Sequence, residues 1–91
     1  MNDFDKPEDL ATTEALLATL DGSKMAKNCN AITGGCLRAE DALKVAKMVC
    51  LAALRRPGQM VQVAGLCALA DDTEVCLGYG AQITTAKRLP V

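Results

Sequence analysis

The segment from Met48 to Ala70, MVCLAALRRPGQMVQVAGLCALA, constrains the fold of this chain more than any other part of the sequence. Two apolar runs flank a short basic joint that contains Pro57. The longest uninterrupted apolar stretch, Met48 to Leu54, is far shorter than the roughly 20 residues that a membrane-spanning helix needs. We therefore interpret the whole segment as the core and an interface of a folded domain.

Composition limits the class of protein. The 91 residues are enough for one small domain, 1–91, and we expect residues 1–6 and 86–91 to be flexible. Hydrophobic residues make up 51% of the chain and aromatic residues only 2%, so the core must be built from Ala, Leu, Val, Met and Cys. A net charge of −1 argues against bulk electrostatic binding to nucleic acid or to a membrane surface. The N-terminus MNDFDKPED has no signal-peptide pattern, so we expect a cytoplasmic protein.

Helix signals and helix breakers alternate along the chain. Asp5 and Glu8 flank Pro7 in an arrangement typical of a helix start, and Pro57 marks a helix end. The sequence predicts a mostly α fold, a bundle of about four helices over Pro7–Leu20, Ser23–Asn30, Leu37–Arg56 and Gln59–Ala70.

The C-terminal half admits a second interpretation, an α+β fold with a β-hairpin. Met60–Leu69 and Glu74–Thr85 would then be two strands joined by the sequence ADDT. We favour the helical interpretation because Ala and Leu are good helix formers and the apolar–polar alternation is weak. Gly65 would cost the fourth helix up to about 1 kcal/mol relative to Ala, so it marks either a close backbone approach or a segment that is not helical.

The predicted fourth helix is apolar nearly all round. Its only polar side chains are Gln59 and Gln62. Such a helix is buried on every side, which is difficult to achieve within one small domain. The sequence therefore predicts a homodimer.

The predicted third helix has two distinct faces. One face is apolar and forms a packing seam made of Ala42, Leu43, Ala46, Val49, Cys50, Ala53 and Leu54. The opposite face mixes cations with two apolar side chains, and we predict that it binds another protein through Lys44, Lys47, Met48, Leu51, Arg55 and Arg56. The partner would present an apolar surface rimmed by acidic groups. Alternatively, the first helix or the C-terminal tail covers Met48 and Leu51, with the lysines reaching water.

Catalytic motifs are scarce in this sequence. There is no histidine, and the five cysteines contain no CxxC pair, so we expect neither a cofactor nor a metal site. Cys36, after TGG and near the start of the third helix, is the best placed thiol for activation, although a small buried apolar role is the simpler interpretation.

Three functions remain open at this point. We predict a non-catalytic protein-binding module, a small regulator, adaptor or inhibitor of a larger complex, with nucleic acid and membrane not among its partners. The first alternative is a dimeric DNA-binding regulator that displays Lys44, Lys47, Arg55 and Arg56 twice. A helix-turn-helix across residues 62–82 would carry no cation on its second helix, which argues against this alternative. The second alternative is a thiol-dependent or metal-dependent activity at the cysteines.

Overall fold

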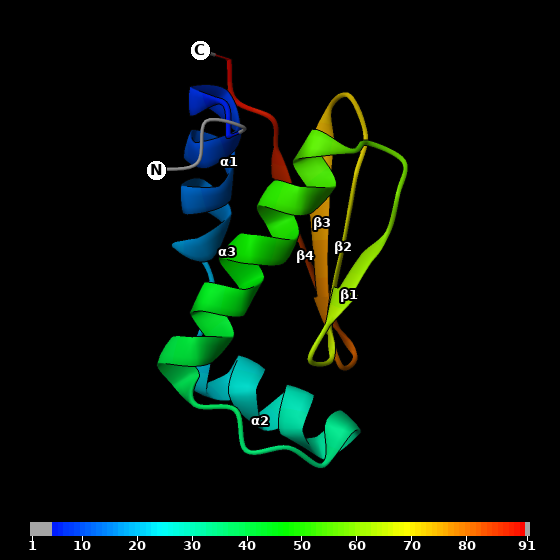
Figure 1. Cartoon of the computed structure of the whole chain (residues 1–91). Coiled ribbons are helices and arrows are strands. Elements are labelled where there is room, and N and C mark those ends of the chain that lie inside the picture. The colour runs from blue at the N-terminus through cyan, green and yellow to red at the C-terminus, as the bar shows by residue number, and fades with distance from the viewer. Residues whose placement is uncertain (1–4, 91) are drawn as a thin grey trace.

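The computed structural model describes residues 5–90 as three helices followed by a four-stranded antiparallel sheet (Figure 1). The helices are α1 (Pro7–Leu17), α2 (Gly22–Thr33) and α3 (Ala39–Arg55). The strands are β1 (Val61–Val63), β2 (Leu66–Ala70), β3 (Glu74–Tyr79) and β4 (Gln82–Lys87). Consecutive strands are neighbours, so the sheet is a meander in the order β1-β2-β3-β4. Within residues 5–90, none of the helices is long and apolar enough to cross a bilayer.

The prediction of a four-helix bundle is wrong, and the α+β alternative is closer to the structure. The predicted fourth helix, Gln59–Ala70, is instead the hairpin of β1 and β2. The sequence concealed these strands because Cys67 and Leu69 on the outward face of β2 are as apolar as the inward residues, which removes the alternation typical of a half-buried strand. Gln59–Ala70 is therefore not a helix that needs burial on every side, and the homodimer predicted from such a helix loses this support.

Tight turns divide each of the two long strands that the alternative interpretation predicted. Ala64 and Gly65 join β1 to β2 with φ angles of 54° and 88°, as a type I′ turn requires. Gly80, with φ of 63°, is the first residue of the β3–β4 turn, as a type II′ turn requires. A Cβ on Gly65 would lie only 3.3 Å from the Cα of Cys29, so this glycine permits the close approach of the hairpin to α2.

The first three predicted helices are confirmed, with shifted ends. The helix α2 begins one residue earlier than expected, because the Asp21 side chain accepts hydrogen bonds from the backbone N–H of Ser23 (3.0 Å) and Lys24 (3.3 Å). The helix α1 begins at Pro7, but its N-cap residue is Lys6, with no side-chain cap. The helix start that Asp5, Pro7 and Glu8 predict is confirmed, but Asp5 does not cap it.

The helix α3 is the centre of the domain, and it packs against α1, α2 and the first three strands. Its predicted apolar seam is confirmed, since all seven residues are buried except the half-buried Leu43. All three helices lie on one side of the sheet (Figure 1). The sheet contributes Leu66, Ala68, Ala70, Val75, Leu77 and Tyr79 to the core. Among residues 5–90, no helix covers the opposite face of the sheet.

The end of β4 is attached to α1. The sequence predicts flexibility over residues 86–91, whereas Ala86 and Lys87 belong to β4. Beyond the strand, the backbone N–H of Arg88 donates to the Thr73 carbonyl (2.8 Å), and the N–H of Leu89 donates to Thr12 Oγ1 (2.9 Å). The two segments predicted to be flexible also include residues 1–4 and 91. These five residues lie outside the described residues, whereas Asp5, Lys6 and Pro90 lie within them.

Substituting the turn residue Ala64 with Asn is expected to raise the free energy of unfolding by about 0.5–1 kcal/mol. Asn tolerates the left-handed backbone, which costs other L residues about 1–2 kcal/mol. Gly65→Ala is the matched opposite, because it places a Cβ at positive φ within 3.2 Å of Thr33 Cγ2, and it should destabilise the fold. Urea denaturation measures both changes. A destabilising Ala64→Asn would contradict the turn geometry.

The Asp71 carboxylate should make stability depend on pH. Its Oδ1 accepts hydrogen bonds from the N–H of Thr73 (2.7 Å), the N–H of Glu74 (2.9 Å) and the Thr73 hydroxyl (2.9 Å), which hold the Asp71 pKa below its ordinary value. Because the folded-state pKa is lowered, this stabilisation is present above the pKa of the unfolded chain and is lost as pH falls through the folded-state pKa.

Asp71→Asn is therefore expected to lower the free energy of unfolding at neutral pH, and the difference from the parent should shrink below about pH 4. Chemical denaturation across the acidic range measures this difference. A difference that stays constant down to the lowest pH would show that the charge of the carboxylate is not what stabilises the β2–β3 turn.

Candidate functional site

A hollow of about 990 Å³ opens between the start of α1, the end of α3 and the first strand. We call it the basic hollow. It is lined by Lys6, Asp9, Ala52, Leu54, Arg55, Arg56, Pro57, Gln59, Met60, Val61, Gln62 and Arg88. Four of these side chains are cations and only one is a carboxylate, although the whole chain has a net charge of −1. Positive charge is therefore concentrated at this site.

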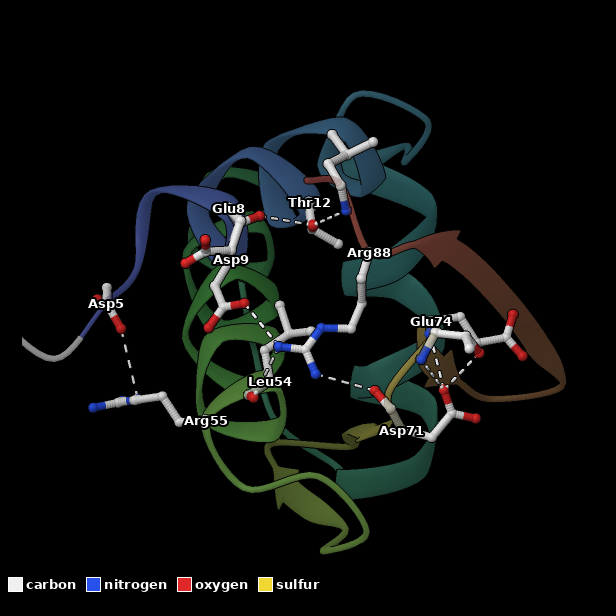
Figure 2. Close-up of polar contacts among 11 residues, drawn as sticks. Asp5, Glu8, Asp9, Thr12, Leu54, Arg55, Asp71, Glu74 and Arg88 are labelled. Atoms are coloured by element: carbon white, nitrogen blue, oxygen red, sulfur yellow. Dashed lines mark hydrogen bonds and ion pairs between the residues drawn. The ribbon is translucent and has the colours of Figure 1, made fainter. Parts of the chain in front are cut away.

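The wall of the hollow is held in place by Arg88 (Figure 2). Its Nη2 donates to Oδ1 of Asp9 at 3.0 Å and lies 3.5 Å from the Leu54 carbonyl, while its Nη1 donates to the Asp71 carbonyl at 3.1 Å. Asp9 is only 2% exposed, so its carboxylate depends on this charged partner. One guanidinium thus connects α1, the end of α3 and the β2–β3 turn.

The remaining cations differ in how far they are neutralised. Arg55 Nε lies 3.6 Å from the Asp5 carboxylate, whose side chain is 10% exposed. Lys6 and Arg56 are exposed, and among residues 5–90 no ion pair involves either of them. These two side chains are the cations that an anionic ligand would meet first.

The hollow also has apolar walls. Its apolar lining residues come from the last turns of α3, from the joint that follows it and from the start of β1, and they are Ala52, Leu54, Pro57, Met60 and Val61. Met60 is 54% exposed. Apolar walls with a cationic rim suit a ligand that has both acidic and apolar groups.

The structure separates the six residues predicted to bind a partner. Lys44 is exposed and Met48 is 50% exposed, but neither lines the hollow. Lys47 Nζ is 3.2 Å from the Glu14 carboxylate of α1. Leu51 is only 7% exposed, so it is not available as an anchor. The alternative interpretation, in which the first helix or the C-terminal tail covers both Met48 and Leu51, therefore agrees with the burial of Leu51 but not with the exposure of Met48.

Arg55 and Arg56 are the two predicted residues that lie in the hollow. Sequence reasoning missed Lys6 and Arg88, which come from opposite ends of the chain. No local pattern identifies them, because only the packing of α1 against β4 and α3 brings the two ends together. The short RRPG sequence was the only available signal for this site.

The five cysteines are all free thiols. Cys36 is exposed in the loop before α3, whereas the sequence favours a buried, apolar role for this thiol. Burial raises the pKa of Cys29 and raises that of Cys50 to about 12. Burial, followed by the Glu74 and Asp71 carboxylates, raises the pKa of Cys76. A raised pKa disfavours the thiolate, the nucleophilic form, so these three thiols are poorly suited to covalent chemistry at neutral pH.

Within residues 5–90, His, Cys, Asp and Glu side chains form no group of three or more that could hold a metal ion. Comparisons with protein families, with curated proteins and with solved structures found no match to this chain. The function must therefore be inferred from the chemistry of the basic hollow itself.

Arg88→Ala is expected to lower the free energy of unfolding by about 3 kcal/mol or more, because it leaves the buried Asp9 carboxylate without its cation. Asp9→Ala should cost less, about 1–2 kcal/mol, since Arg88 retains two carbonyl partners and some solvent contact. Urea denaturation measures both. The control is Arg38→Ala, whose ion pair with Glu40 is exposed and should contribute less than about 1 kcal/mol. Equal small losses for all three variants would contradict this role of Arg88.

Proposed function

We propose that this chain is a non-catalytic protein-binding module, and that its basic hollow binds an acidic segment of the partner protein. The observation that carries the proposal is the convergence of four cations, from three separate parts of the chain, around apolar walls. Complementary charge steers such a partner to the site, and contact with the apolar walls retains it.

The proposed ligand is a protein segment with Asp or Glu beside apolar side chains. Lys6 and Arg56 would pair with the carboxylates, while Met60 and Val61 would contact the apolar side chains. Nucleic acid fits less well, because the residues that line the hollow include no aromatic side chain on which bases could stack.

The role that follows from this proposal is that of a regulator, adaptor or inhibitor of a larger protein complex. The raised pKa values of three thiols support a structural rather than a catalytic use of those cysteines. Five free thiols favour a reducing compartment, and we therefore include a cytoplasmic location in the proposal.

A titration followed by nuclear magnetic resonance tests this function. The probe is a synthetic peptide rich in Glu with Leu at intervals, and its control is the same peptide with Gln in place of Glu. The acidic peptide should shift the backbone signals of Arg56 and Met60, and the Gln peptide should not. Arg56→Glu should weaken binding about 10-fold, whereas Lys27→Glu on the exposed surface of α2 should leave it nearly unchanged.

Two results would overturn the proposal. One is equal binding of the acidic and Gln peptides, or shifts that lie outside the hollow. The other is selective binding of a short random-sequence DNA duplex at Arg56, with affinity that falls steeply with salt, while the acidic peptide has no effect.

A further inference from the structure

The uncovered side of the sheet has an unusual composition. We call it the outer sheet face, and strand alternation assigns to it Gln62, Cys67, Leu69, Glu74, Cys76, Gly78, Ile83, Thr85 and Lys87. Solvated faces of antiparallel sheets are ordinarily polar. Here the centre is apolar or weakly polar, Leu69 is 39% exposed and Ile83 is 77% exposed.

Strands β3 and β4 place two complementary pairs on this face, Gly78 with Ile83 and Glu74 with Lys87. Ile83 projects from β4 directly beside Gly78 of β3, which has no side chain. The place that a Cβ would take on Gly78 lies 3.1 Å from Cys67 Sγ, so the thiol already fills part of the space over the glycine. The face thus carries a projecting apolar side chain next to a position that has no side chain.

The only charges on the outer sheet face lie together at its other end. Glu74 and Lys87 are directly opposed across β3 and β4, yet they form no ion pair among the described residues. Glu74 is half-buried and Lys87 is exposed. Both charges therefore remain available to a partner that approaches the face.

A single two-fold axis between two copies of the chain brings both pairs into contact, Ile83 with Gly78 and Lys87 with Glu74. An axis parallel to the strands, midway between β3 and β4 and above the face, places β4 of a second copy over β3 of the first. Each outward residue of β3 in one copy then faces, in the other copy, the β4 residue with which it is paired in the sheet. Ile83 of the second copy then lies over Gly78 and the Cys67 thiol, and Lys87 of the second copy meets Glu74. Symmetry repeats both contacts, as an isologous interface requires, and sheets pack in nearly this alignment.

We propose that the outer sheet face is a homodimer interface, formed by β3 and β4 of two copies about this axis. The occupant of the face is a second copy of the chain because one operation pairs the opposite charges of Glu74 and Lys87 and places each exposed Ile83 over the glycine that has no side chain. The basic hollow lies between the start of α1, the end of α3 and the first strand, and its residues make none of these contacts. This inference is therefore independent of the proposed function.

The dimer should be weak. From standard strand spacing and rise, β3 and β4 present a patch of roughly 10 by 20 Å, which is well below the about 800 Å² per partner of a standard interface. We expect a dissociation constant on the order of 100 µM at low salt, increasing as salt screens the Glu74–Lys87 contacts.

Sedimentation equilibrium in reducing buffer, from about 10 µM to about 1 mM, measures the association. The parent should approach twice the chain mass at the highest concentrations. Ile83→Asp should weaken association at least about 10-fold. Ile32→Asp, at a 60% exposed position on α2 outside this face, is the matched control and should associate like the parent. Circular dichroism checks that both variants are folded.

Charge exchange between chains tests the axis itself. Glu74→Lys and Lys87→Glu should each be monomeric alone, because each faces like charge in its own homodimer. An equimolar mixture of the two variants should dimerise, since the charges are complementary only between the two different chains. A parent that remains monomeric to about 1 mM, an Ile83→Asp variant that still dimerises, or a mixture that stays monomeric while the parent dimerises would each overturn the proposal.

Discussion

The ion pair between Arg88 and the buried Asp9 is the interaction on which the arrangement of the domain most depends. It joins the end of the last strand to the first helix, and the same guanidinium reaches carbonyls at the end of α3 and in the β2–β3 turn. A core made of small side chains has little aromatic surface with which to position α1. A directional, charge-assisted contact supplies that position, and in doing so it builds one wall of the basic hollow.

Much of the helical layer could be predicted from the sequence. Pro7 and Pro57 mark helix ends, and the spacing of Ala42, Ala46 and Ala53 identifies the buried seam of α3. The sheet could not be predicted in the same way, because both faces of β2 are apolar and Ala and Leu dominate its sequence. Gly65 was the one residue of this segment that argued against a helix. It permits the turn between β1 and β2 and the close contact of the hairpin with α2.

The candidate site was only half visible in the sequence. Arg55 and Arg56 are adjacent in the chain and were recognised as cations beside an apolar helix. Lys6 and Arg88 become part of the same site only through tertiary packing, and Leu51 leaves the predicted surface because it is buried. The apolar character of the outer sheet face led to the wrong prediction of a fourth helix over Gln59–Ala70. The same apolar character is part of the reason for proposing this face as a dimer interface.

Native-state hydrogen exchange of α1 tests the central role of Arg88 most directly, because it reports how firmly each element is held. In the parent, the amides of Thr13 and Leu16 should exchange with free energies close to those of the buried residues of α3. In Arg88→Ala, the α1 amides should lose more protection than the amides of β2 and β3. If α1 already opens easily in the parent, or if α1 and the sheet lose protection equally, the ion pair does not hold the first helix in place.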